Sequence, residues 1–219
     1  LVAARQGLVD LDEPAGPPGA TLRHLLAHAS GYAFDSRAVL AAPGRSRIYS
    51  NAGIDAAAAL VEARAGRHFG TLVRDSVLGP LGMDDTRLDG PASSGLVGPA
   101  GDLVRLALEV LRPRVLAAEL AQATAVAFPG LRGVLPGFGM QAACDWGLGL
   151  EIRGTKSPHW TGARSSPRTV GHFGRSGTFL WVDPDAGVAL ACLTDREFGP
   201  WAASSWPALS DAALAGLGR

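Results

Sequence analysis

The first two-thirds of the chain carries apolar residues at three-and-four spacing, the pattern of helices that bury one face. Several of these segments end at glycine or proline, as helices commonly do. One predicted helix begins after Thr21, which acts as N-cap, and ends at Gly31. The other predicted helices cover residues 55–65, 69–78, 102–111 and 114–128.

From Trp146 onward the apolar residues alternate with polar or small ones, which is typical of strands. Strands are predicted over residues 146–152, 168–174, 178–182 and 188–193, and the last two form a hairpin around 183–187. Residues 201–217 predict a closing helix, interrupted near Pro207 because proline lacks a backbone N–H. Helices, then consecutive antiparallel strands, then a helix predict an α+β fold with helices packed on a sheet.

The chain shows no internal repeat and no long polar linker. Residues 1–219 are therefore predicted to form a single domain, mostly helical over 1–145, with antiparallel strands and a C-terminal helix over 146–219. Residues 1–7 read as the second half of a helix that Gly7 stops, so we expect a segment upstream of Leu1. The localisation, cytoplasmic or secreted, is therefore left open.

Composition narrows the class of protein. Of the 219 residues, 47% are hydrophobic and 18% are charged, which indicates a globular core, and no apolar run approaches the roughly 20 residues of a membrane span. Twenty basic residues balance twenty acidic ones, so a small-molecule partner is favoured over nucleic acid or an anionic membrane surface. Cys144 and Cys192 are too few for a disulfide framework and are predicted to be unpaired, buried thiols.

Several familiar catalytic and binding motifs are incomplete in this sequence. His24 and His28 have the four-residue spacing of a metalloprotease helix, but Leu25 stands where its glutamate belongs, so no metal is predicted. We expect His28 and Ser30 instead to end the helix and to hydrogen-bond its last turn. The stretch from Gly174 to Thr178 lacks the second glycine of a nucleophile elbow, and no glycine-rich run continues into a phosphate loop. No cofactor is predicted.

Four motifs remain in a fixed order. They are the segment 21–31, the triplet Tyr49-Ser50-Asn51, the run Gly171-His172-Phe173-Gly174, and the hairpin strand Trp181-Val182-Asp183-Pro184. Together they resemble the serine β-lactamase and penicillin-binding-protein superfamily, and most closely the branch of class C β-lactamases, D-Ala-D-Ala carboxypeptidases and related esterases. The resemblance covers almost the whole chain, since residues 8–14 are similar to the segment that follows the nucleophile helix in that family.

The resemblance implies catalytic roles for Tyr49, Asn51 and His172. Tyr49 would relay a proton between nucleophile and leaving group, with its pKa lowered from about 10 by a neighbouring positive charge. Asn51 would hydrogen-bond the family's lysine and the acyl-side amide of the substrate. His172 would stand in the strand that walls the site. Without the other motifs, Tyr49 could equally be a packing residue and Asn51 a helix cap, and His172 a strand histidine satisfied by a neighbour.

Substrate contacts are expected from Ser50, Phe173, Gly174 and Arg175. Gly174 would let the substrate approach the backbone, and the N–H of Arg175 would be one of two oxyanion donors. Penicillin- and peptide-cleaving relatives place a cation and a threonine hydroxyl where this chain has at best His172 and Phe173. A substrate carboxylate would therefore depend on Arg175 or another arginine. The sequence therefore favours uncharged esters over β-lactams and D-Ala-D-Ala peptides.

The family's nucleophile pair, Ser-x-x-Lys, is absent. Lys156 is the only lysine, and three positions before it stands Arg153. We interpret the chain as a serine acyl-hydrolase that lacks its nucleophile segment and, as given, is inactive. The alternatives are a degenerate member of the family and a non-catalytic binding module of the same fold for peptidoglycan-like or acyl ligands. The oligomeric state is not predicted.

Overall fold

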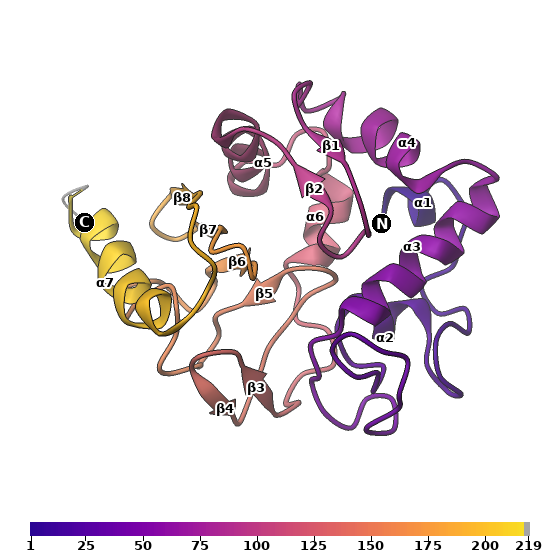
Figure 1. The fold of residues 1–219 in the computed structure, drawn as a ribbon, viewed down its shortest axis with the longest axis horizontal. Helices are drawn as coiled ribbons and strands as arrows, with labels where there is room; N and C mark the ends of the chain where they lie inside the picture. The colour runs from indigo at the N-terminus through magenta and orange to yellow at the C-terminus, as the bar shows by residue number, and fades with distance from the viewer. Residues whose placement is uncertain (217–219) are drawn as a thin grey trace.

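A helical lobe lies beside a four-stranded sheet that carries a helix on each face (Figure 1). This arrangement comes from a computed structural model that describes residues 1–216. The fold is α+β, as predicted. Among the described residues, no helix has the combined length and apolar character that crossing a membrane would require.

The helical lobe is built mainly from short helices. They are α1 (Val2–Arg5), α2 (Leu22–Leu26), α3 (Asn51–Ala65), α4 (Phe69–Val73), the π-helical turn η1 (Arg74–Leu78) and α6 (Ala117–Ala123). Gly66 ends α3 in the left-handed region at φ 62°, which a glycine adopts without strain. The core between α2 and α3 contains Leu22, Leu25 and Ala57.

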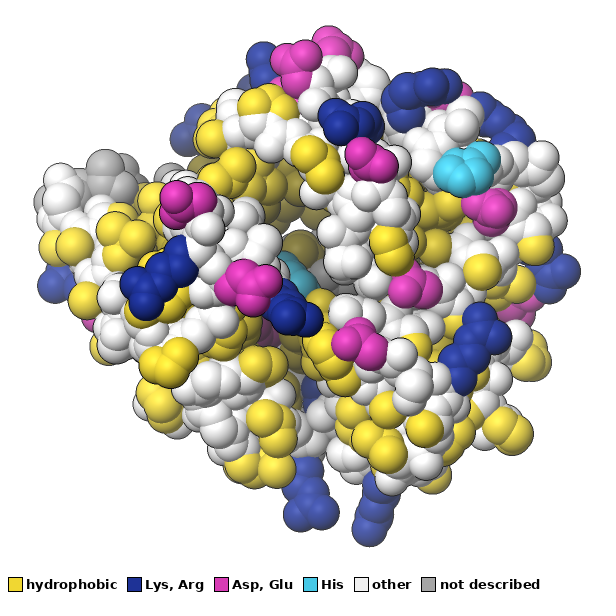
Figure 2. All heavy atoms as spheres, viewed as in Figure 1, with side chains coloured by type: hydrophobic (Ala, Val, Ile, Leu, Met, Phe, Trp, Pro, Cys, Tyr) yellow, Lys and Arg dark blue, Asp and Glu magenta, His cyan; other side chains and the backbone are white. Residues whose placement is uncertain are grey.

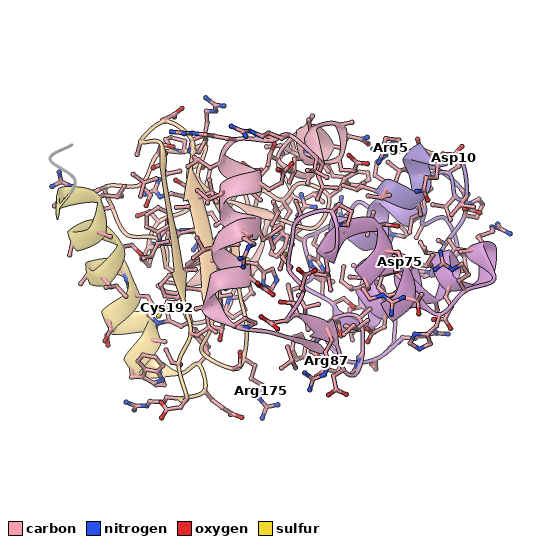
Figure 3. The ribbon with its side chains drawn as sticks, turned by 90° about the horizontal axis from the view of Figure 1, so that it is seen from above. Arg5, Asp10, Asp75, Arg87, Arg175 and Cys192 are labelled. Atoms are coloured by element: carbon pink, nitrogen blue, oxygen red, sulfur yellow. The ribbon has the colours of Figure 1, made fainter. Side chains whose placement is uncertain are left out.

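The sheet is antiparallel, in the order β5 (Glu151–Ile152), β6 (Val170–Phe173), β7 (Phe179–Asp183) and β8 (Val188–Cys192). Seen from above, it stands between α7 (Pro200–Gly216) and α5 (Ala100–Leu111) (Figure 3). Trp181 and Trp206 belong to the core on the α7 side. Ala107 and Val182 belong to the core on the α5 side. Burial on both faces fixes the register of β6, which carries His172.

Several predicted boundaries are confirmed and others are wrong. The predicted helices over 69–78 and 102–111 and the hairpin around 183–187 are present. The helix expected to reach Gly31 ends at Leu26, because His28 takes a positive φ of 53°. The helix predicted over 114–128 is confined to α6. The closing helix α7 passes through Pro207 without interruption, and Leu217 lies outside the described residues.

The strand predicted over 146–152 is largely wrong. Only β5 is a strand there, Trp146 forms an isolated bridge with Glu151, and the intervening residues form a turn closed by the bond from Gly147 N to Leu150 O. A Cβ on Gly147 would overlap the carbonyl oxygen of Ala123, so the glycine serves close backbone packing. The alternation of apolar and small residues over 146–152 therefore marks a tightly packed turn rather than a strand.

Two short hairpins were not predicted. The first pairs β1 (Arg87–Leu88) with β2 (Leu96–Val97), and the second pairs β3 (Gly133–Leu135) with β4 (Gly139–Gln141). Both lie within the part expected to be mostly helical. The two cysteines are unpaired as predicted, with Cys144 buried and Cys192 only half-buried.

Candidate active site

A cleft of about 410 Å³ opens between the helical lobe and β6. Figure 2 shows this hollow from its open side, with a histidine side chain at its base. The lining combines predicted site residues with aromatic and apolar neighbours. Its members are Phe34, Arg47, Tyr49, Asn51, Ser93, Ser94, Val134, Leu135, Pro136, Cys144, Trp146, Glu151, His172, Phe173, Gly174, Arg175, Ser176 and Phe198.

Tyr49 stands at the cleft just before α3, inside a cluster of rings. Its ring centroid lies 4.4 Å from that of His28, 5.5 Å from His172 and 5.8 Å from Trp146. Burial, with a smaller effect from Asp35, raises the pKa of Tyr49 to about 12. The expected lowering of this pKa is therefore wrong for these residues, because no positive group in the described part of the chain opposes the burial. The phenol is therefore protonated near pH 7 and is able to donate a hydrogen bond.

Ser50 is not a cleft residue, which corrects the prediction that it binds substrate. Its hydroxyl donates to Ala33 O at 2.6 Å and accepts from Gly53 N at 3.0 Å, so Ser50 is the N-cap of α3. Its backbone N–H donates to Nδ1 of buried His28 at 3.1 Å. Ser50 thereby fixes the backbone between Tyr49 and Asn51.

Asn51 reaches the cleft, but its amide is engaged elsewhere. Nδ2 donates to Oδ1 of Asp35 at 2.8 Å, at the exposed edge of the site. Asn51 is the first residue of α3 and not its cap, since Ser50 fills that position. The resemblance implies that the Asn51 amide contacts a lysine and the substrate. To make those contacts, the amide would have to give up its hydrogen bond to Asp35.

His172 faces the cleft from β6. Its ring centroid lies 5.5 Å from Tyr49 and 5.6 Å from Trp146. Burial lowers its pKa, and the opposing effect of Glu151 is smaller, so the imidazole is neutral near pH 7. His172 therefore does not supply the cation that a carboxylate-bearing substrate would need.

Phe173, Gly174 and Arg175 line the cleft where β6 turns into β7. The Phe173 ring packs on Phe198 at 4.9 Å, which makes this end of the cleft aromatic. The N–H of Arg175 donates to no acceptor within residues 1–216, as an oxyanion donor requires. Its side chain is 83% exposed, lies 3.7 Å from the Glu197 carboxylate and points away from the body of the protein (Figure 3).

His28 and Ser30 differ from expectation. Neither side chain bonds the last turn of α2, because Nδ1 of His28 accepts from Ser50 and the Ser30 hydroxyl accepts from Tyr32 N at 3.4 Å. His24 accepts from Thr21 N at 3.2 Å and stacks on Phe128. The two histidines thus have separate structural roles, and the described residues contain no cluster of metal-binding side chains.

The cleft residues that were not predicted include Arg47, Trp146 and Glu151. The Arg47 guanidinium is buried and donates to four backbone carbonyls, those of Ala27, Ala127, Phe128 and Cys144. Trp146 supplies a ring between His28 and His172. Glu151 is fully buried and paired with Lys156. Arg47 and Trp146 depend on contacts far along the chain, which no local pattern reveals. The partners of Glu151 are close in the sequence, and the single lysine is the signal that could have drawn attention to it.

Comparisons with known proteins identify the family to which this fold belongs. The family model for Beta-lactamase matches residues 1–215. A beta-lactamase from Mycobacterium bovis is 53% identical, with a TM-score of 0.94 over 98% of this chain and 80% of that one. No curated protein matches the chain.

More distant structures share the fold. The octameric penicillin-binding protein homologue from Pyrococcus abyssi is 19% identical, with a TM-score of 0.73 over 98% of this chain and 62% of that one. EstCE1, a hydrolase with promiscuous acyltransferase activity, is 18% identical, with a TM-score of 0.75 over 97% of this chain and 80% of that one. The fold is that of the serine β-lactamase and penicillin-binding-protein superfamily. The chain belongs to the Beta-lactamase family.

The buried histidines predict acid sensitivity. Burial, with smaller effects from His172 and Arg47, lowers the pKa of His28 to about 3, against about 6.5 in an unfolded chain. Between these values the unfolded chain binds a proton that the folded chain does not, so stability is lost as the pH falls below 6.5. His28 alone should lower the free energy of unfolding by about 2 kcal/mol between pH 7 and pH 5.

Urea unfolding followed by tryptophan fluorescence across this range measures the effect. His28→Gln should flatten the dependence. Equal stability of the wild-type protein at pH 7 and pH 5 would show that His28 is not held neutral.

Proposed function

We propose that this chain forms most of the active site of a serine acyl-hydrolase, which acts through an acyl-enzyme on uncharged esters. The observation that carries the proposal is the arrangement of the cleft. Tyr49 and His172 face one another with ring centroids 5.5 Å apart, and the N–H of Arg175, which has no acceptor within residues 1–216, lines the same cleft. These groups suit a proton donor and relay, a wall, and one oxyanion donor for a tetrahedral intermediate.

The nucleophile is the missing component. An acyl-hydrolase of this kind needs a serine and a lysine one helical turn apart, and these 219 residues contain no Ser-x-x-Lys. Lys156 is no substitute, because its ammonium is buried behind the cleft in a pair with Glu151. The high pKa of Tyr49 fits the absence of that lysine, since a nearby ammonium is the group that would lower it. We therefore propose that a segment upstream of Leu1 supplies both residues.

The substrate preference follows from the charges and walls of the cleft. Phe173 and Phe198 make one wall apolar, His172 is neutral, and the Arg175 side chain points to solvent. A substrate carboxylate placed there would lose its hydration without gaining a cation. Esters of short or medium acyl chains fit better than β-lactams or D-Ala-D-Ala peptides.

A binding module of the same fold is the second candidate. It is favoured by one observation: with Tyr49 protonated and His172 neutral, the described residues already offer a formed cleft with donors but no activated nucleophile. Such a module would hold peptidoglycan-like or acyl ligands without turnover.

Tyr49→Phe tests the relay. In protein that carries the Ser-x-x-Lys segment, the substitution should keep the ring packing but lower turnover of an ester by a factor on the order of 10² to 10⁴. Tyr32→Phe is the matched control, because Tyr32 is the only other tyrosine and lies in the core between α2 and α3. Unchanged turnover of Tyr49→Phe, with native circular dichroism, would remove Tyr49 from the mechanism.

Substrate class is tested by comparing catalytic efficiency on p-nitrophenyl butyrate and on nitrocefin with the same protein. The neutral ester should be used more efficiently, since the Arg47 guanidinium is engaged by backbone carbonyls and the Arg175 side chain points to solvent, which leaves the nitrocefin carboxylate without a partner. Greater efficiency on nitrocefin would instead assign a β-lactamase activity.

A further inference from the structure

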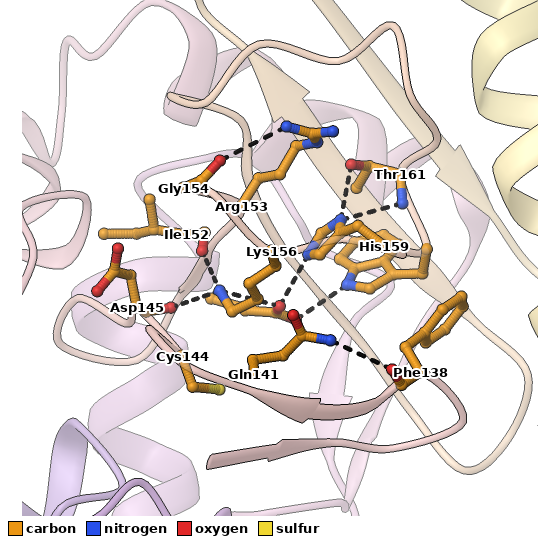
Figure 4. Close-up of polar contacts among 12 residues, drawn as sticks. Phe138, Gln141, Cys144, Asp145, Ile152, Arg153, Gly154, Lys156, His159 and Thr161 are labelled. Atoms are coloured by element: carbon orange, nitrogen blue, oxygen red, sulfur yellow. Dashed lines mark hydrogen bonds and ion pairs between the residues drawn. The ribbon is translucent and has the colours of Figure 1, made fainter. Parts of the chain in front are cut away.

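Lys156 and Glu151 form a fully buried ion pair, and Figure 4 shows Lys156 among its polar contacts. Nζ of Lys156 is 3.3 Å from Oε1 of Glu151, and the two side chains are 0% and 2% exposed. The ammonium also donates to Asp145 O at 2.8 Å and to Ile152 O. A buried pair of this kind costs desolvation free energy that apolar residues would not, so its presence beside a cleft calls for an explanation.

Two further donors fix the Glu151 carboxylate. Nε2 of His159 lies 2.9 Å from Oε1, and Nε1 of Trp160 donates to Oε2 at 2.9 Å. Because an ionised carboxylate only accepts, His159 carries its proton on Nε2, and its Nδ1 accepts from Thr161 N at 3.2 Å. Burial alone would raise the pKa of Glu151, but His159, Lys156 and Trp160 outweigh it and hold the pKa at about 2. Glu151 is therefore charged.

The two members of the ion pair differ in their position relative to the cleft. Glu151 lines the cleft, whereas Lys156 is not among the described residues that do so. On the sheet, Glu151 pairs with Gly171, the residue before His172. Glu151 also raises the pKa of His172, which partly offsets burial, so the field that reaches the imidazole from the pair is negative.

At Cys144, another residue of the cleft, Lys156 and Arg47 lower the pKa of the thiol while Glu151 raises it. At His172 on β6, Glu151 is the charged group that acts on the pKa within the described residues. The Arg47 guanidinium is held by backbone carbonyls and acts on His28, whose pKa it lowers. The Arg175 side chain lies outside, beside Glu197. Glu151 is the only acidic residue in the lining of the cleft as the structure describes it.

We infer that Glu151 is a specificity-determining residue: backed by Lys156, it makes the β6 wall of the cleft electronegative, so that the site accepts uncharged acyl or alcohol groups and rejects carboxylates. This inference deepens the proposed function and adds a residue to it. Glu151 acts through its field on the ligand, and the same hydrogen bonds hold Trp160 against Phe173, with ring centroids 5.5 Å apart.

The test measures binding, so it does not depend on turnover. The full chain is titrated at pH 8 with 4-nitrobenzamide and with 4-nitrobenzoate, which have nearly the same shape and differ in charge. Both quench tryptophan fluorescence, and Trp146 lines the cleft. The measured quantity is the ratio of the two Kd values, carboxylate over amide, which should exceed one for the wild-type protein.

Substitutions of the pair should move this ratio in opposite directions. Glu151→Gln should lower it by about three- to tenfold, because the negative charge is lost, and Lys156→Met should raise it, because the charge loses its counterion. The double variant should fall between them and keeps the test available if Glu151→Gln does not fold. Glu109→Gln is the matched control: Glu109 is a buried carboxylate that accepts the N–H groups of Arg114, Val115 and Leu116, away from the cleft.

A purely structural role for the pair would weaken folding in both single variants without shifting the ratio in opposite senses. A ratio that is unchanged in Glu151→Gln, or equally changed in Glu109→Gln, would overturn the inference. Absence of saturable binding of either ligand would overturn it as well. Failure to hydrolyse esters would contradict the proposed function, whereas the ratio of the two Kd values could still be measured.

Discussion

The hydrogen bond from the backbone N–H of Ser50 to Nδ1 of His28 joins the end of α2 to the beginning of α3, and the position of Tyr49 depends on it. His28 reaches this place because its backbone takes a positive φ after α2 stops, which costs conformational energy for a non-glycine residue. The same ring then packs against Tyr49 and against Trp146. A charged imidazole would lose the acceptor on Nδ1, so the joint requires a neutral, buried histidine.

The opposite wall of the cleft is held by a different kind of constraint. β6 is buried on both faces between α5 and α7, which fixes which residues it turns to the cleft. Glu151 then connects the loop that carries Lys156, His159 and Trp160 to this strand through charge-assisted hydrogen bonds. One wall is therefore positioned by a helix cap and the other by a sheet core, and the proposed site lies where they meet. The rigid support on both sides is what a preformed site needs.

Local signals in the sequence account for much of the helical framework. The end of α3 at Gly66 and the hairpin between β7 and β8 follow from turn residues that act within a few positions. The turn after Trp146 was predicted as a strand because alternation cannot distinguish a pleated strand from a packed glycine-rich turn. The motifs predicted that Tyr49 and His172 belong to one site, and both line the same cleft. Ser50 was assigned a substrate contact because it is adjacent to Tyr49, but its side chain bonds Ala33 and Gly53 instead.

The pKa values and charge pairs of the site could not be predicted from the sequence. The pKa of Tyr49 depends on which charges surround it after folding. The role of Arg47 depends on backbone carbonyls far along the chain, and that of Glu151 on how the following loop folds back onto it. The central claim is that this cleft is an acyl-hydrolase site whose nucleophile lies outside these 219 residues. Intact-protein mass spectrometry after incubation of this chain with p-nitrophenyl butyrate or a fluorescent penicillin tests it most directly. The account predicts no covalent adduct, and an acyl group attached to any residue of this chain would contradict it.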